Sequence, residues 1–136
     1  MFLCATNALY GPMAEALLVR IDCEHFEPAS AGISPEQLHP RTAEVMAEIG
    51  IDLSQRNSKR VQELANQSFD FVITLDDATA RLTRNFPDAE TIHWKFDDLA
   101  AVDHEKQLRV FRMVRDQIAQ RLHLFVLVQA RSQRAA

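Results

Sequence analysis

The chain has 136 residues, of which 47% are hydrophobic and 25% charged. This length and balance predict one soluble globular domain with a full core and exclude a disordered chain. The formal charge of −4 comes from acids and bases scattered along the sequence, so no nucleic-acid-binding or anionic-membrane surface is indicated. No apolar run approaches the roughly 18 residues that cross a bilayer, and the N-terminus lacks a signal-peptide pattern. We therefore expect a cytoplasmic protein without nucleic-acid or membrane partners.

The first half of the chain alternates short apolar runs with helical patterns. Residues 1–4 are predicted to end a first strand, and Pro12 to open a helix over residues 13–21. Residues 25–31 are predicted to form a second strand closed by Gly32. The apolar spacing of residues 39–49 predicts a helix that Gly50 stops.

The second half continues the alternation. Residues 61–65 and 76–85 are predicted to be helical, and residues 69–75 and 90–93 to be strands. A long helix is expected from about 103 to 128, with an apolar stripe of Leu108, Phe111, Val114, Ile118 and Leu122. We expect one domain over residues 1–128 and a polar C-terminal tail over residues 129–136.

Alternating strands and helices predict an α/β fold, a three-layer sandwich with a four-stranded parallel sheet covered on both faces. Ligands of such sheets bind at the carboxyl ends of the strands. The loop that follows the first strand begins there, at Cys4.

Cys4 follows a strand and precedes a helix by a few residues. Helix N–H groups and the helix dipole can hold an oxyanion there and lower a thiol pKa toward the reactive thiolate. Asn7 tolerates the left-handed backbone that a tight anion-binding loop needs. On position alone, a lone cysteine of this kind is more commonly a buried small hydrophobic residue.

The stretch that begins at Cys4, Cys-Ala-Thr-Asn-Ala-Leu-Tyr-Gly-Pro-Met-Ala-Glu, resembles the opening of a known family. In the low-molecular-weight tyrosine phosphatases and the related arsenate reductases it reads Cys-x-Gly-Asn-x-x-Arg-Ser-Pro-Met-Ala-Glu. The resemblance extends over about residues 1–128, and it implies a flavodoxin-like fold with a phosphate-binding loop after strand 1. Further matches follow in order at Ser30-Ala31-Gly32, His39-Pro40-Arg41, Gly50-Ile51-Asp52-Leu53-Ser54, Phe69-Asp70-Phe71-Val72-Ile73-Thr74 and His93-Trp94.

The resemblance also implies roles for individual residues. Cys4 matches the nucleophile that forms a cysteinyl-phosphate, and Asp98 matches the aspartate that protonates the leaving oxygen and later activates water. Leu99 stands where the family has proline after that aspartate, and Asp97 is a neighbour that can be confused with it. The implied phosphate-binding loop consists of Ala5, Thr6, Asn7, Ala8, Leu9, Tyr10 and Gly11.

Three positions of this loop depart from the family pattern. Tyr10 replaces an arginine whose planar fork binds two phosphate oxygens. Phosphate-directed arginines contribute about 10³–10⁵ in rate. Gly11 replaces a serine that assists the thiolate, and Thr6 replaces a glycine of the cradle. These changes indicate an impaired or repurposed site.

The arsenate reductase branch needs further cysteines after the third strand, and this chain has none there. Asp76 instead resembles the phosphatase branch. Cys23, the only other cysteine, is not at a matching position and is expected to be an inert free thiol. For Trp94 two placements are open: it lines the wall of the site, or it packs as an aromatic residue under a loop.

Three functions remain open from the sequence. The first is cysteine-dependent hydrolysis of a phosphomonoester of the tyrosine-phosphate type, weak or lost because of Tyr10. The second is a non-catalytic pseudophosphatase that binds an oxyanion or regulates a partner, and the third is an arsenate reductase with an external thiol. We expect phosphate or a similar oxyanion as ligand, a phosphoprotein as one candidate partner, no cofactor and no metal, because the histidines lack metal-ligand spacing. The apolar last helix could also form an oligomer contact.

Overall fold

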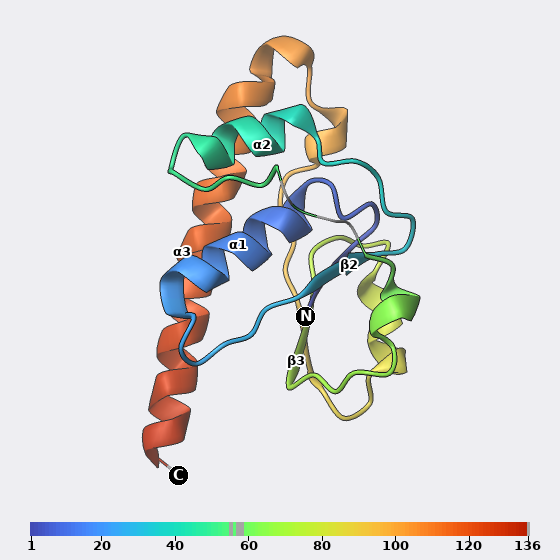
Figure 1. The fold of residues 1–136 in the computed structure, drawn as a ribbon, viewed down its shortest axis with the longest axis vertical. Helices are drawn as coiled ribbons and strands as arrows, with labels where there is room; N and C mark the ends of the chain where they lie inside the picture. The colour runs from blue at the N-terminus through green and yellow to red at the C-terminus, as the bar shows by residue number, and fades with distance from the viewer. Residues whose placement is uncertain (55, 57–58, 136) are drawn as a thin grey trace.

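The computed structural model describes residues 1–54, 56 and 59–135, and its centre is a parallel four-stranded sheet (Figure 1). The strand order is β2-β1-β3-β4, so the first strand lies inside the sheet. Strand β2 pairs on one side of β1, and β3 and β4 follow on the other side. This order and the parallel pairing confirm the predicted α/β fold of flavodoxin-like type. The strands are β1 (Phe2–Cys4), β2 (Ser30–Gly32), β3 (Phe71–Thr74) and β4 (Glu90–His93).

Alternate side chains of the strands face two different cores. In β1, Phe2 and Cys4 join the larger cluster, whereas Leu3 joins the smaller one on the opposite face. In β3, Ile73 faces the larger cluster and Val72 the smaller. The period of two therefore orients the Cys4 side chain toward the helical face of the sheet.

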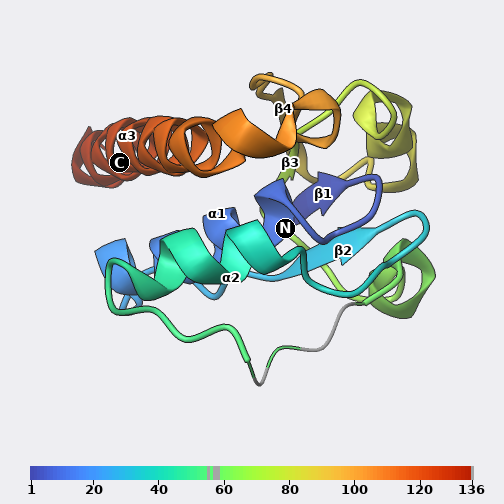
Figure 2. The same cartoon turned by 90° about the horizontal axis from the view of Figure 1, so that it is seen from above.

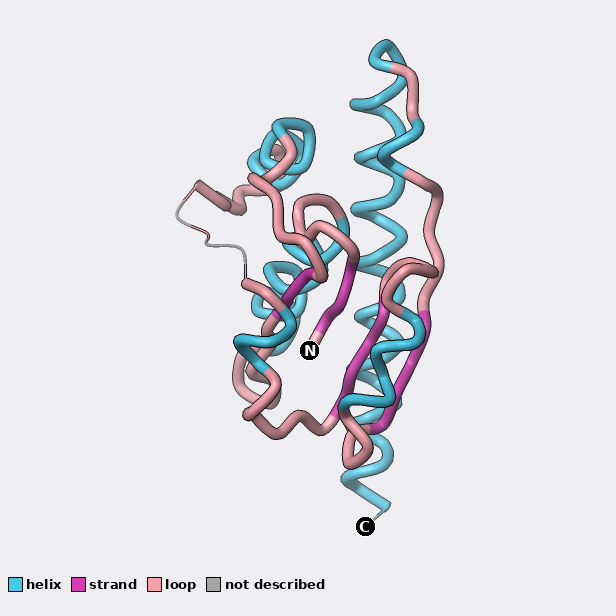
Figure 3. The backbone as a smooth tube through the Cα atoms, turned by 90° about the vertical axis from the view of Figure 1, so that its right-hand side faces the viewer, coloured by secondary structure: helices cyan, strands magenta, loops and turns pink. Residues whose placement is uncertain are grey.

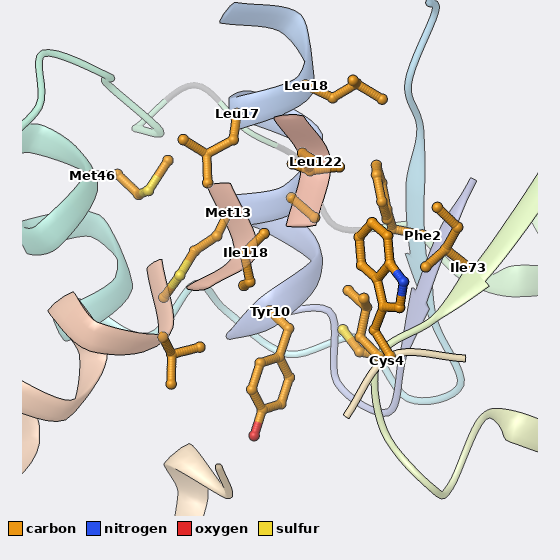
Figure 4. Close-up of a cluster of buried hydrophobic side chains, with 14 of the residues drawn as sticks. Phe2, Cys4, Tyr10, Met13, Leu17, Leu18, Met46, Ile73, Ile118 and Leu122 are labelled. Atoms are coloured by element: carbon orange, nitrogen blue, oxygen red, sulfur yellow. The ribbon is translucent and has the colours of Figure 1, made fainter. Parts of the chain in front are cut away.

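Three α-helices cover that face, as seen from above in Figure 2. They are α1 (Tyr10–Asp22), α2 (Pro40–Ala47) and α3 (Gln107–Ala135). Helix α1 packs against both β1 and α3, and α2 packs against α3. The predicted stripe of α3 is confirmed, because Phe111, Val114, Ile118 and Leu122 are fully buried in the larger core. Figure 4 shows Met13 and Leu17 of α1 and Ile118 and Leu122 of α3 within this cluster.

The opposite face is covered by the short 3-10 helices η1 (Val61–Leu64) and η2 (Ala80–Asn85). The helical segments predicted at 61–65 and 76–85 are thus 3-10 helices, and the second is helical only from Ala80 to Asn85. In the second segment, Asp76 and Thr79 close a turn through their side chains, and the Thr83 hydroxyl bonds back to the Ala80 carbonyl. Such local bonds compete with a regular α-helix, and Pro87 prevents its extension.

Other boundaries shift for local reasons. Strand β2 begins at Ser30 instead of residue 25, because Pro28 has no N–H to donate to a neighbouring strand. Helix α3 starts at Gln107, after the 3-10 turn η4 (His104–Lys106), and continues to Ala135 through the segment expected as a tail. Ala136, the end of that expected tail, lies outside the described residues. No helix in the described part of the chain is long and apolar enough to cross a membrane.

The carboxyl ends of the strands meet at one edge of the sheet, where loops follow them (Figure 3). Cys4 ends β1 at this edge, and β3 pairs with β1 in parallel, so the residues after β3 lie beside the Cys4 loop. The loop that follows β4 leads to Asp98 at the start of the 3-10 helix η3 (Leu99–Ala101). The fold thus gathers three loops around Cys4.

Candidate active site around Cys4

The loop after Cys4 is fastened from behind through its carbonyl groups. The carbonyls of Ala5, Thr6 and Ala8 accept hydrogen bonds from the backbone N–H groups of Ser34, Glu36 and His39, at 3.0, 2.9 and 3.1 Å. In a trans peptide the N–H points opposite to the C=O of the same unit. The N–H groups of Thr6, Asn7 and Leu9 therefore point away from this supporting segment. A loop built this way presents amides as an anion-binding nest.

Asn7 makes the tight bend of the loop. Its φ of 51° makes it the one non-glycine residue with positive φ among the described residues. Asparagine adopts this left-handed conformation more readily than most side chains, as expected from the sequence. Gly32 allows the close approach of β2, because a Cβ at that position would lie 3.0 Å from the Asn7 nitrogen and 3.1 Å from the Ala5 oxygen. The loop therefore packs so tightly against β2 that a side chain at position 32 would force one of them to shift.

The Cys4 thiol is 1% exposed, with its sulfur 4.0 Å from Asn7 Oδ1. Burial raises the pKa of this thiol from the ordinary value of 9.0 to about 11. The backbone N–H groups of Gly11 and Asn7 oppose this rise, the carboxylate of Asp76 adds to it, and the more distant charge of Arg56 lowers it. Two loop amides thus face the sulfur, yet the resting group is a neutral thiol.

Tyr10 links the Cys4 loop to the loop that carries Asp98. Its hydroxyl donates to the Asp97 carbonyl oxygen at 2.6 Å and accepts from the Leu99 N–H at 3.1 Å. The ring stacks at 6.2 Å from that of Phe96, and the side chain is 7% exposed. Figure 4 shows the hydroxyl end of Tyr10 pointing away from the aliphatic cluster. The phenol thus joins the two loops, and its hydroxyl already donates one hydrogen bond and accepts another.

A hollow of about 330 Å³ opens beside Cys4. Asp98 contributes to its wall, whereas Asp97 does not and instead faces a neighbouring hollow on α3. The Asp98 carboxylate accepts the Ala100 N–H at 3.0 Å and so caps η3, which fixes the direction of its side chain. Of the two adjacent acids, Asp98 is therefore the one that shares a cavity with the thiol. The lining also includes Ala5, Thr6, Leu9 and Tyr10 of the predicted loop.

The charges around this hollow are mostly negative. Asp76, Asp77 and Asp98 line it, and Lys95 is the one basic side chain that does so among the described residues. The Lys95 amine lies 3.3 Å from Asp77, which lowers the pKa of that exposed carboxyl. Asp76 accepts the Ala5 N–H at 2.7 Å, so one amide at the start of the loop already has an internal anionic partner. A bound dianion would meet repulsion here that an arginine at position 10 would have offset.

Comparison with known proteins bears directly on this geometry. The family described as Low molecular weight phosphotyrosine protein phosphatase matches residues 1–134. The chain belongs to this family.

The relatives within the family include arsenate reductases. An arsenate reductase of Halalkalibacterium halodurans is 35% identical over 91% of both chains, and one of Bacillus subtilis is 33% identical over the same shares. A solved structure titled as an arsenate reductase in the phosphate binding state has a TM-score of 0.77 at 27% identity, covering 93% of this chain and 95% of that one. The YwlE arginine phosphatase from Geobacillus stearothermophilus, at 21% identity and a TM-score of 0.79, shows the shared fold.

The family resemblance located most of the site residues but not all of them. The structure brings Cys4, Asp98 and the loop together, and it buries Trp94 in the core against Phe125, away from the hollow. Sequence reasoning missed Lys95 and the bond from Ala5 to Asp76. The placement of Asp76 directly after a strand that neighbours β1 was a usable signal, since the carboxyl ends of neighbouring parallel strands adjoin.

Proposed function

We propose that this member of the family is a slow phosphomonoesterase that acts through Cys4 on substrates of the tyrosine-phosphate type. The observation that carries this proposal is the shared hollow of Cys4 and Asp98 at the carboxyl end of β1. A sulfur nucleophile and a carboxyl group in one cavity are the two groups that a two-step phosphoryl transfer needs.

In the first step the Cys4 thiol loses its proton to solvent, the resulting thiolate attacks phosphorus, and the bond from phosphorus to the ester oxygen breaks. The N–H groups of the loop hold the phosphoryl oxygens, and the protonated Asp98 carboxyl gives its proton to the leaving oxygen. In the second step the Asp98 carboxylate takes a proton from water. That water attacks phosphorus and the bond from phosphorus to sulfur breaks, which releases inorganic phosphate, returns Cys4 as the thiolate and leaves Asp98 protonated for the next cycle.

Three features make the proposed reaction slow. Tyr10 offers no positive charge, and its hydroxyl is already bonded to Asp97 and Leu99. The thiol pKa of about 11 leaves little thiolate near neutral pH. The carboxylates of Asp76 and Asp77 also oppose the approach of a dianion.

Hydrolysis of 4-nitrophenyl phosphate tests the proposal. We expect a low rate in the wild type that Cys4→Ser abolishes and that Cys23→Ser leaves unchanged, because Cys23 is exposed at the end of α1. Equal rates for Cys4→Ser and the wild type would contradict it.

A second pair of variants tests the acid. Asp98→Asn is expected to slow phenyl phosphate hydrolysis by about 10²–10⁴, the usual contribution of a general acid. Asp97→Asn, its exposed neighbour, is the matched control and is expected to keep the wild-type rate. Equal losses in both variants would remove Asp98 from the proposed mechanism.

A non-catalytic oxyanion-binding module is the second candidate. It is favoured by the internal hydrogen bonds of the Tyr10 hydroxyl and the Ala5 N–H. Because these two groups are already bonded, they are not free to stabilise a transition state. This candidate predicts phosphate binding by calorimetry with no Cys4-dependent turnover, and no recovery of activity in Tyr10→Arg. Measurable hydrolysis that depends on Cys4 would exclude it.

Arsenate reduction with an external thiol is the third candidate, favoured by the names of the curated relatives. The chain has only two cysteines, and Cys23 is exposed at the far end of α1 from the Cys4 loop, so an added thiol would have to supply the electrons. The test is arsenate-dependent oxidation of glutathione. A rate that survives in Cys4→Ser would exclude a role for this site.

A further inference from the structure

Arg56 lies behind the Cys4 loop, in the segment between α2 and η1. Its side chain is 10% exposed, and arginine is rarely buried to this extent unless it is paired. One terminal nitrogen donates to Asn7 Oδ1 at 3.3 Å and to the Ser30 hydroxyl, and Nε donates to a Glu15 carboxylate oxygen at 3.3 Å. A nearly buried guanidinium with three acceptors is part of the packed structure and is not a surface ion pair.

The three acceptors belong to three different parts of the fold. Asn7 is in the Cys4 loop, Ser30 begins β2, and Glu15 lies on α1. The planar fork of arginine can reach several acceptors in fixed directions, which the ammonium group of lysine cannot do. Arg56 therefore fixes the loop relative to the strand and the helix on either side of it.

We propose that Arg56 is a positioning residue that holds the Cys4 loop in its anion-binding form. Its contact is with Asn7, the residue that carries the positive φ and therefore the conformational cost of the bend. The guanidinium holds the Asn7 side chain, and the fixed bend keeps the neighbouring N–H groups directed toward the sulfur. The part of this proposal that concerns catalysis rests on the proposed function, whereas the part that concerns loop conformation does not.

Gly11 fits the same arrangement. A Cβ at position 11 would collide with Asn7 Oδ1 and lie 3.2 Å from the Cys4 sulfur. The space that a serine side chain would fill is thus used by the asparagine amide that Arg56 holds. The departure at Gly11 and the presence of Arg56 are two parts of one support for the loop.

Arg56 does not take over the task of an arginine at position 10. It lines a separate hollow formed with the segments around Pro35 and Leu53, and it is not part of the wall of the Cys4 hollow. It reaches the thiol only through Asn7 and through a weak electrostatic effect on the Cys4 pKa. A substrate would therefore not contact it.

Amide hydrogen exchange tests the proposal without any turnover. In Arg56→Ala we expect the amides of residues 5–10 to exchange about 10- to 100-fold faster, as the loss of a hydrogen bond from a charged group implies. Amides in β3 and in the middle of α3 are expected to keep wild-type protection. Addition of methylguanidinium is expected to restore protection in Arg56→Ala and to have no effect on the wild type.

Arg112→Ala is the matched control, because Arg112 also pairs with a carboxylate, that of Glu48, but lies on α3 away from the loop. It is expected to leave residues 5–10 unchanged. Should Arg56→Ala fail to fold, amide exchange is measured in Arg56→Lys instead. This variant keeps the positive charge but loses the planar guanidinium that reaches several acceptors. Wild-type protection of the loop, or equal loosening of the loop, β3 and α3, would overturn the proposal.

Calorimetry with inorganic phosphate separates the two claims. Weaker binding in Arg56→Ala that methylguanidinium restores supports the positioning of an anion-binding loop. If the wild type itself binds no phosphate while exchange in the loop still depends on Arg56, the proposed function fails and the conformational role of Arg56 stands. If phosphate affinity and loop exchange are both independent of Arg56, the positioning role fails.

Discussion

Replacement of Tyr10 by phenylalanine removes only the hydroxyl that joins the Cys4 loop to the Asp98 loop. The Leu99 N–H, buried with its acceptor at 3.1 Å, would lose its partner, while the Asp97 carbonyl belongs to an exposed residue and can bind water instead. An unsatisfied buried donor costs about 1–3 kcal/mol. For a domain of this length we therefore expect the melting temperature to fall by about 4–10 °C.

Thermal unfolding followed by circular dichroism measures this change. Because Tyr10 is the only tyrosine of the chain, the ultraviolet titration of the wild type reports on the same group. Burial raises the pKa of this phenol above its ordinary value of 10.0, with Asp98 and Asp76 adding to the rise and the Leu99 N–H opposing it. A melting temperature within about 1 °C of wild type, or a phenol that titrates at its ordinary value, would refute the claim that the Tyr10 hydroxyl joins the two loops.

Other predictions concern the thiol, the acids and the close contact behind the loop. Alkylation of Cys4 by iodoacetamide is expected to show a pKa near 11, with Cys23 as the exposed thiol in the same sample; a Cys4 value at or below 9.0 would contradict the burial. Between pH 9 and 11 the Cys4 thiol keeps its proton in the folded protein and releases it in the unfolded chain. The free energy of unfolding in urea is therefore expected to fall as the pH rises through this window, and a constant free energy would contradict the raised pKa. Asp76→Asn removes a negative charge from the hollow and is expected to tighten phosphate binding in calorimetry by about tenfold or more, whereas unchanged affinity would place the anion elsewhere. Gly32→Ala puts a methyl group 3.0 Å from the Asn7 nitrogen and is expected to cost about 1–3 kcal/mol in urea unfolding; a neutral substitution would mean that the loop is not tight.

The regular parts of the fold were predictable because their patterns are local. The β-branched and aromatic residues of 69–75 predict a buried strand, and the structure buries Val72, Ile73 and Thr74. The helical spacing from Phe111 to Leu122 indicates which face of α3 is buried, and the structure buries that face. The failures lie where side chains compete with the backbone. Residues 76–85 have a helical composition, but the bonds of Asp76 and Thr79 close a turn at the start of the segment, and only Ala80–Asn85 is helical, as a 3-10 helix.

The candidate site was predictable only as far as it resembles the family. Cys4, Asp98 and the loop follow from the aligned motif, and the left-handed backbone at Asn7 follows from the residue type. Arg56 could not be identified from the sequence. It is one of several basic residues in a polar stretch, and its value depends on three acceptors that only the folded chain brings together. The same holds for Tyr10, since its two partners lie 87 and 89 residues further along the chain.

The central claim is that Cys4 is a phosphoryl acceptor, and trapping of the intermediate tests it most directly. In Asp98→Ala, 4-nitrophenyl phosphate has a leaving group that needs no proton, but the water that would release the phosphate from sulfur lacks its base. Acid quenching followed by mass spectrometry of the peptide that contains Cys4 is expected to show a phosphate on that cysteine. It should be absent in Asp98→Ala that also carries Cys4→Ser. An unmodified Cys4 peptide after incubation with saturating substrate would contradict the account.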